Sequence, residues 1–219
     1  MKLERMDDFF AARIEGYDEH MRRDIEGASA FYAFTAALLP KDADAVVLDL
    51  GCGTGLELEA YFALNPTAQI TGIDLSDVML RELKAKFPEK KLTLICNSYF
   101  DEPFGAACFD AAVSVESLHH FTAEKKAALY AKLYNALKKG GIFILTDYFA
   151  ESEELEKEYF RNLEILKREQ GIADDAFYHY DTPLLVEHEM ELLGKAGFPE
   201  VELLQKWGES TYTVRAKKC

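Results

Sequence analysis

The feature that most constrains the fold is the alternation of short apolar segments with amphipathic ones between residues 45 and 150. The run AVVLDL at 45–50 is mostly apolar, as expected for a parallel strand that is buried on both faces. Comparable strand-like runs occur at 68–75, 91–96, 109–116 and 142–149. Helical segments separate them at 56–64, 76–87 and 122–138, and Gly140-Gly141 is expected to end the last one. Strand and helix in alternation predict right-handed crossovers, and therefore an α/β fold with a doubly wound parallel sheet.

The flanking regions add helices and one hairpin to this core. Helices are expected at 4–16 and 18–39, and Pro40 would end the second. Strands at 199–207 and 210–218, joined at Gly208-Glu209, predict an antiparallel hairpin at the sheet edge. We therefore expect a single domain with a Rossmann-like seven-stranded sheet. Its predicted parts are an N-terminal helical cap (1–40), a cofactor-binding core (41–150), a helical lid insertion (151–183), and a last helix with the hairpin (184–219).

The stretch VLDLGCGTGLE at 47–57 places Gly51, Gly53 and Gly55 directly after the first strand. Ligands of doubly wound folds bind beyond the carboxyl ends of the strands, and glycines let backbone N–H groups approach them closely. Asp74 ends the second strand, where its carboxylate can accept hydrogen bonds from both hydroxyls of a ribose. The structural alternatives are that the glycines only form a tight turn against a closely packed helix, and that Asp74 is only an acid at the start of the next helix. Together, the turn and the acid predict a cofactor that contains a nucleoside.

The spacing of the turn and the position of Asp49 indicate which nucleoside cofactor is meant. The turn reads G-C-G-T-G rather than G-x-G-x-x-G, and Asp49 stands two residues before its first glycine. A carboxylate there would repel a pyrophosphate but could anchor an ammonium group, or it could hold the N–H groups of the loop itself. S-adenosylmethionine carries a ribose, an ammonium and a sulfonium but no phosphate. The pattern favours this cofactor over a nicotinamide dinucleotide, so a dehydrogenase is disfavoured.

Several segments in register carry a resemblance to a known family. VVLDLGCGTGLE followed by ITGIDLSDVML resembles motifs I and II of the class I S-adenosylmethionine-dependent methyltransferases. FDAAVSVESLHHF and LKKGGIFILTDYF are similar to the fourth-strand and fifth-strand segments of that family. The resemblance covers residues 45–150 and implies the fold, the cofactor S-adenosyl-L-methionine and a transferase activity of class EC 2.1.1.-. It leaves the substrate open.

The resemblance also implies cofactor contacts, residue by residue. The methionine end would lie against Asp49, Gly51, Cys52 and Gly53, and the ribose against Asp74. The family often has an acid and a small residue after the third strand, where this chain has Asn97 and Ser98. The other residues that the resemblance implies as cofactor contacts lie near the adenine, near the methyl group or in the N-terminal segment. They are Leu75, Met79, Asn97, Ser98, Tyr99, Val115, Glu116 and Tyr17.

Residues just past the fourth strand are candidates for the chemistry. Methyl transfer is an in-line displacement, and it needs a general base only if the attacking atom carries a proton. Glu116, His119 and His120 could act as base or orient the acceptor, whereas LHHF as a structural cap is the alternative. Aromatic residues in 151–183, with Arg161 and His179, are expected to cover a small acceptor, or else to form a satellite core or dimer contact.

Composition narrows the expected partners. The net charge is −14, which disfavours binding to nucleic acids and anionic membranes. No CxxC or HExxH spacing occurs, so no metal is predicted. We expect a cytoplasmic methyltransferase, monomeric or homodimeric, that acts on a small molecule. The alternatives are a tRNA or protein methyltransferase, a non-catalytic cofactor binder, and an enzyme that uses carboxy-S-adenosylmethionine, which a cation from Arg13 or Arg161 near the methyl group would favour.

Overall fold

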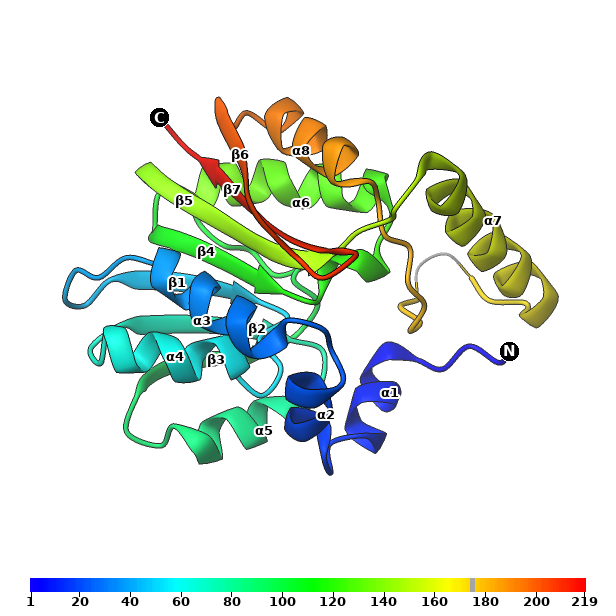
Figure 1. The fold of residues 1–219 in the computed structure, drawn as a ribbon. Coiled ribbons are helices and arrows are strands. Elements are labelled where there is room, and N and C mark those ends of the chain that lie inside the picture. The colour runs from blue at the N-terminus through cyan, green and yellow to red at the C-terminus, as the bar shows by residue number, and fades with distance from the viewer. Residues whose placement is uncertain (174–175) are drawn as a thin grey trace.

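The computed structural model describes residues 1–173 and 176–219 (Figure 1), so Asp174 and Asp175, in the predicted lid insertion, lie outside the described residues. One seven-stranded sheet has the strand order β3-β2-β1-β4-β5-β7-β6. Five strands run parallel: β1 (Val46–Leu50), β2 (Gln69–Asp74), β3 (Lys91–Cys96), β4 (Phe109–Val115) and β5 (Leu137–Tyr148). The order reverses between β1 and β4, which places the ligand-binding crevice of this fold beside β1.

The predicted C-terminal hairpin is confirmed. β7 (Thr211–Lys217) pairs antiparallel with β5, and β6 (Glu200–Trp207) pairs antiparallel with β7 and forms the sheet edge. Gly208 lies between them with a φ of +57°, a left-handed conformation that favours glycine. The predicted doubly wound Rossmann-like sheet with one antiparallel strand is thus the observed fold.

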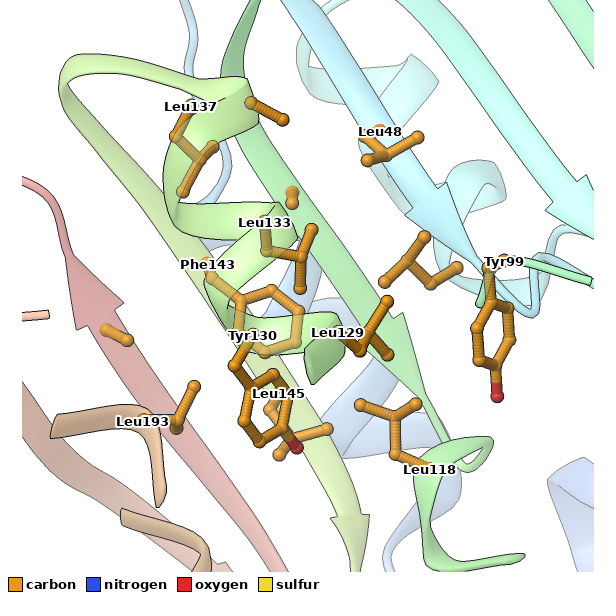
Figure 2. Packing of buried hydrophobic residues seen from close by; sticks show 14 of the residues in the cluster. Leu48, Tyr99, Leu118, Leu129, Tyr130, Leu133, Leu137, Phe143, Leu145 and Leu193 are labelled. Carbon is orange, nitrogen blue, oxygen red and sulfur yellow. The ribbon is translucent and has the colours of Figure 1, made fainter. Parts of the chain in front are cut away.

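Helices cover both faces of the sheet, and two hydrophobic clusters join them to it. One face carries α3 (Ala28–Leu38), α4 (Leu56–Leu64) and α5 (Asp77–Lys86). The other carries α6 (Ala123–Ala136) and α8 (Val186–Lys195). Figure 2 shows how side chains of α6 interdigitate with those of the sheet, including Leu129, Leu133 and Phe143. Burial of these side chains fixes the strands whose carboxyl ends hold the site.

Two expected boundaries were wrong. The helix predicted at 18–39 is two helices, α2 (Tyr17–Arg23) and α3, because Gly27 has a φ of +77° and packs against Trp207. Gly140-Gly141 does not cap a helix: α6 ends at Ala136, and the chain passes directly into β5. Gly140, with a φ of +79°, lies where the pairing of β5 with β4 is irregular, and its N–H donates to the Lys218 carbonyl.

The N-terminal segment and the chain after α7 lie together at the carboxyl end of the sheet. α1 (Met6–Ala12) and α2 lie beside the strand ends, and α7 (Glu153–Gln170) projects outward (Figure 1). The Met6 N–H donates to the Phe177 carbonyl at 3.1 Å, and the His179 N–H donates to the Glu4 carbonyl at 3.0 Å. These bonds join the two segments that flank the candidate site. Within the described residues, no helix has both the length and the apolar character needed to cross a membrane.

Candidate active site

A cavity opens at the carboxyl edge of the sheet, between the glycine turn and the helices α1 and α2. Its free volume is about 50 Å³, well below the roughly 300–1,000 Å³ of ordinary ligand pockets. Side chains of the N-terminal helices, among them Phe10 and Tyr17, form one wall. The predicted site residues that line it are Tyr17, Gly51, Gly53, Asp74, Leu75, Met79, Tyr99, Val115, Glu116 and His120.

The glycine turn after β1 has the conformation that its residues predict. Gly51, Gly53 and Gly55 have φ angles of +72°, +46° and +76°. A Cβ atom on Gly51 would lie 2.1 Å from the Ser117 Oγ, so the turn and the segment after β4 approach too closely for any side chain. The turn therefore packs directly against Ser117, and its Gly51 and Gly53 line the cavity with backbone atoms alone.

Asp74 lies at the end of β2 and faces the glycine turn. Its Oδ2 accepts the Gly53 N–H at 2.9 Å, and its Oδ1 accepts the Ser76 N–H at 2.8 Å. Burial raises the pKa of the Asp74 carboxyl, and the two N–H donors oppose that rise. Each carboxylate oxygen retains a lone pair, so this held carboxylate can also accept from two ribose hydroxyls.

Asp49 does not line the cavity, because it is only 1% exposed and lies behind the glycine turn. It adjoins Glu57, in the first turn of α4, which is 5% exposed. The Asp49 Oδ2 and the Glu57 Oε1 are buried without a hydrogen-bond partner among the described residues. Burial raises the pKa of both carboxyls, and the charge of the adjoining Glu57 raises that of Asp49 further. Two adjoining buried carboxyls fit a nearby ammonium group.

Sequence reasoning missed Glu57 as a site residue. The signal was an acid within the otherwise apolar run LELEAYF, directly after the glycine turn. Asp147 and Asp181 were also missed: both lie far along the chain from the residues that they contact.

Three predicted cofactor contacts point their side chains elsewhere. Cys52 is buried in the core, with its Sγ against Gly72. The Asn97 Nδ2 donates to Glu102 at 2.8 Å, and the Ser98 Oγ accepts the Phe100 N–H at 3.1 Å. None of the three lines the described cavity. Their contacts with the cofactor stay predictions, and they would have to come from the backbone or from a rearranged side chain.

Past the end of β4, the candidate catalytic residues join a buried cluster with two acids. His119 and His120 belong to the short 3-10 helix η1 (Leu118–His120). The His119 Nδ1 lies 2.5 Å from the Asp147 Oδ1, and the His120 Nδ1 lies 3.0 Å from the Asp181 Oδ1. Glu116, with a φ of +50°, occupies a strained position for a residue with a side chain. The LHHF segment therefore has a structural role as well as a place in the site.

The environment of this cluster shifts the pKa values of its members in different directions. Burial raises the pKa of Glu116 to about 8, and the charge of Asp147 adds to the rise. Burial alone would lower the pKa of His119, but its partner Asp147 raises it to about 9. Burial and the nearby His119 lower the pKa of His120 to about 4. Pairs of groups with opposite shifts in one cleft are typical of functional sites.

A second cavity of about 650 Å³ adjoins the first. The two share four wall residues: Phe10, Tyr17, Glu116 and His120. The other residues of the second cavity include His119, His179 and Asp181, along with Arg13 and His20 of the N-terminal helices. This volume is that of a small-molecule pocket.

The cations considered from sequence do not reach the first cavity. The Arg13 guanidinium stacks on the Phe9 ring, 3.6 Å from its centroid, and pairs with Glu4 at 3.1 Å. Arg161 belongs to α7 and lines neither cavity. Among the described residues, the lining of the first cavity includes acids but no lysine or arginine.

Comparison with known proteins agrees with this geometry. Residues 47–141 match the family described as "Methyltransferase domain". A carboxy-S-adenosyl-L-methionine synthase from Campylobacter concisus is 30% identical over 183 residues, which are 79% of this chain and 76% of that protein. The chain belongs to the class I S-adenosylmethionine-dependent methyltransferases. It is an enzyme of this family, and S-adenosyl-L-methionine is its cofactor, as the sequence predicted.

Other proteins that resemble this methyltransferase carry names that refer to different substrates. A tRNA (carboxymethyluridine(34)-5-O)-methyltransferase from Xenopus tropicalis is 30% identical over 78% of this chain, although the match spans only 25% of that protein. Human N-acetylserotonin methyltransferase, solved with S-adenosylmethionine, has a TM-score of 0.65 at 20% identity, over 97% of this chain and 56% of that one. A cyclopropane synthase from Mycobacterium tuberculosis has a TM-score of 0.66 at 14% identity, over 91% and 88%. These likenesses support the fold and leave the acceptor open.

Proposed function

We propose that this methyltransferase transfers the methyl group of S-adenosylmethionine to a small molecule bound in the 650 Å³ cavity. The observation that carries the proposal is the wall that this cavity shares with the first one, formed by Phe10, Tyr17, Glu116 and His120. The methyl group of a cofactor bound in the first cavity, next to Glu116, would face an acceptor bound in the second cavity across that wall. Such proximity and alignment are the main requirements of the displacement.

The cofactor would occupy the first cavity. Its ribose hydroxyls would donate to Asp74, with the adenine against Leu75 and Met79, and its ammonium group would approach the Asp49–Glu57 pair through the glycine turn. The present free volume of about 50 Å³ is too small for this ligand. We therefore expect α1 and α2, whose side chains form one wall of the cavity, to move outward on binding and to close over the bound cofactor as a cap.

The residues around the shared wall would then direct the displacement. The bound cofactor would supply the methyl group to a lone pair of the acceptor, and the electrons of the broken C–S bond would leave with S-adenosylhomocysteine. If the attacking atom carries a proton, Glu116 is placed to accept it, because its carboxyl lines both cavities. His120 shares that wall and His119 lines the acceptor side, so both would orient the acceptor.

Two alternative activities fit less well. The carboxy form of the cofactor carries a carboxylate beside the sulfonium, and no lysine or arginine of the described residues lines the first cavity to pair with it. A tRNA acceptor would have to approach a chain of net charge −14, which repels its phosphates.

We place the enzyme in the cytoplasm, since its four cysteines are free thiols. Residues 1–40 and 151–183 would then serve as cap and lid of a single domain.

The acceptor class can be tested directly with labelled cofactor. The protein would be incubated with S-[methyl-³H]adenosylmethionine and either total tRNA or a deproteinised small-molecule extract of the same cells. We expect label in the small-molecule fraction, reduced at least tenfold by Glu116→Gln and unchanged by Asp77→Asn, an exposed acid on α5. Label in tRNA or in protein would contradict the proposal.

A further inference from the structure

We infer that His119, His120 and Asp181 form a binding site for a divalent transition-metal ion in the wall of the acceptor cavity. One ligand atom from each residue lies within 4.8 Å of the others. Two imidazoles and one carboxylate are a ligand set that binds zinc, iron, cobalt and nickel well. The inference goes beyond the proposed methyl transfer and does not depend on it.

The distances between the ligand atoms suit a shared ion. The Asp181 Oδ1 lies 3.0 Å from the His120 Nδ1 and 3.7 Å from the His119 Nε2. Two atoms that each bind an ion at about 2.1 Å are about 3.0 Å apart at a right angle and about 3.6 Å apart at 120°. The observed separations correspond to angles of about 90° and about 124° at the ion, and the third pair of ligand atoms lies within 4.8 Å, so a shift of a few tenths of an ångström would admit the ion.

Two of these atoms are buried without a hydrogen-bond partner. The His120 Nδ1 and the Asp181 Oδ1 face each other at 3.0 Å, yet neither has hydrogen-bond geometry with the other or with any described residue. The His120 side chain is only 5% exposed, so water does not readily replace the missing partner. A buried polar atom that is left unsatisfied destabilises the fold. A cation between them would satisfy both atoms at once.

Asp147 holds His119 in the orientation that a metal ligand requires. Its Oδ1 lies 2.5 Å from the His119 Nδ1, and its Oδ2 accepts the Leu118 N–H at 2.8 Å. With Nδ1 engaged, the Nε2 of the same ring is the atom left to face Asp181. A carboxylate behind a ligating histidine is the usual support of such a site, because it fixes the ring and makes the imidazole more basic.

The backbone keeps the third ligand in place. The Thr182 N–H donates to the His119 carbonyl at 2.7 Å, which joins the segment after α7 to η1 directly beside Asp181. Both histidines and Asp181 line the 650 Å³ cavity, so an ion can enter, and its open positions would face the acceptor. If the proposed function holds, the ion would bind an acceptor oxygen and make its proton easier to remove.

Cobalt titration tests the site without any need for an acceptor. Full-length protein, freed of metal with a chelator and dialysed, would be titrated with Co²⁺ alone and followed by its visible ligand-field absorption. Competition with Zn²⁺ would then give the zinc affinity. We expect one ion per chain, and binding that is weaker by about 100-fold or more in Asp181→Asn and in His120→Gln. Asp147→Asn should weaken binding by about 10- to 100-fold.

The matched control is His188→Gln. His188 lies on α8 and contacts Glu156, outside the cluster, so its loss should leave cobalt binding unchanged. Asp181 is 44% exposed, and asparagine has nearly its shape, so Asp181→Asn should remain folded, which circular dichroism would verify. No saturable binding to the wild type, or equal binding by the wild type and Asp181→Asn, would overturn the inference. Cofactor binding and methyl transfer would be measured in separate assays, so that a failure of the proposed function can be distinguished from a failure of the metal site.

Discussion

The position of Asp74 makes a quantitative prediction about cofactor binding. Its two oxygens already accept the Gly53 and Ser76 N–H groups, each retains a lone pair, and Asp74 lines the cavity. In Asp74→Asn, the amide NH₂ cannot accept a hydrogen bond, so one ribose hydroxyl and one backbone N–H lose their acceptor. Each hydrogen bond to a charged group contributes about 1.5–3 kcal/mol. The backbone N–H loses its acceptor with or without ligand, so only the ribose bond enters the affinity, and its loss of up to about 3 kcal/mol corresponds to up to about 150-fold weaker binding of S-adenosylhomocysteine.

Calorimetric titration would measure this loss, with Asp77→Asn as the matched control. Asp77 lies three residues further along the chain and pairs with Arg81 in solvent, so its substitution should change the affinity less than threefold, roughly the size of a surface effect. Methylthioadenosine keeps the ribose but lacks the amino-acid end, so Asp74→Asn should weaken it by a similar factor. NAD should not bind the wild type. Wild-type affinity in a well-folded Asp74→Asn protein would refute the assignment of the ribose to this carboxylate.

Three further predictions concern the turn, the buried carboxyls and the core. Gly51→Ala should abolish cofactor binding and destabilise the fold by roughly 1–3 kcal/mol, because the added Cβ meets Ser117. A second substitution, Ser117→Gly, should restore part of the stability and of the binding. Thermal melting and calorimetry would measure these two quantities, and a Gly51→Ala protein that matches the wild type in both would contradict the close approach. The pKa of Glu57 is raised in the folded protein, so its charged form destabilises the ligand-free protein at pH values above the ordinary carboxyl pKa of about 4. Glu57→Gln should therefore melt at a higher temperature than the wild type at pH 8, and the difference in melting temperature should shrink towards pH 5. A difference that does not change with pH would exclude this cause. Lys126→Met removes the cation that lies 2.6 Å from the buried Glu189 carboxylate and should cost about 3–5 kcal/mol in urea unfolding. Lys126→Met with Glu189→Gln removes the unpaired charge and keeps an acceptor for the Tyr130 hydroxyl, so it should recover most of that loss, and no recovery would contradict the ion-pair explanation.

The sequence predicted most of the fold and the cofactor end of the site because both depend on local patterns. Apolar strands, amphipathic helices and the glycine turn occupy short stretches, and the turn brings Asp74 to Gly53 through the pairing of two adjacent strands. The helix boundaries at Gly27 and Gly140 failed for a different reason. Gly27 packs against Trp207, and the Gly140 N–H donates to Lys218, partners that are remote in sequence and invisible to periodicity.

The sequence by itself determined a doubly wound sheet, a glycine turn with an acid on the next strand, and an S-adenosylmethionine cofactor. Only the tertiary structure decided which acids meet the histidines, because Asp147 and Asp181 lie 28 and 61 positions from the histidines that they contact. It also decided that Glu57 adjoins Asp49, and that the cavities on either side of Tyr17 and Glu116 share a wall. Contacts of this kind depend on how remote segments pack, and packing is set by the whole core.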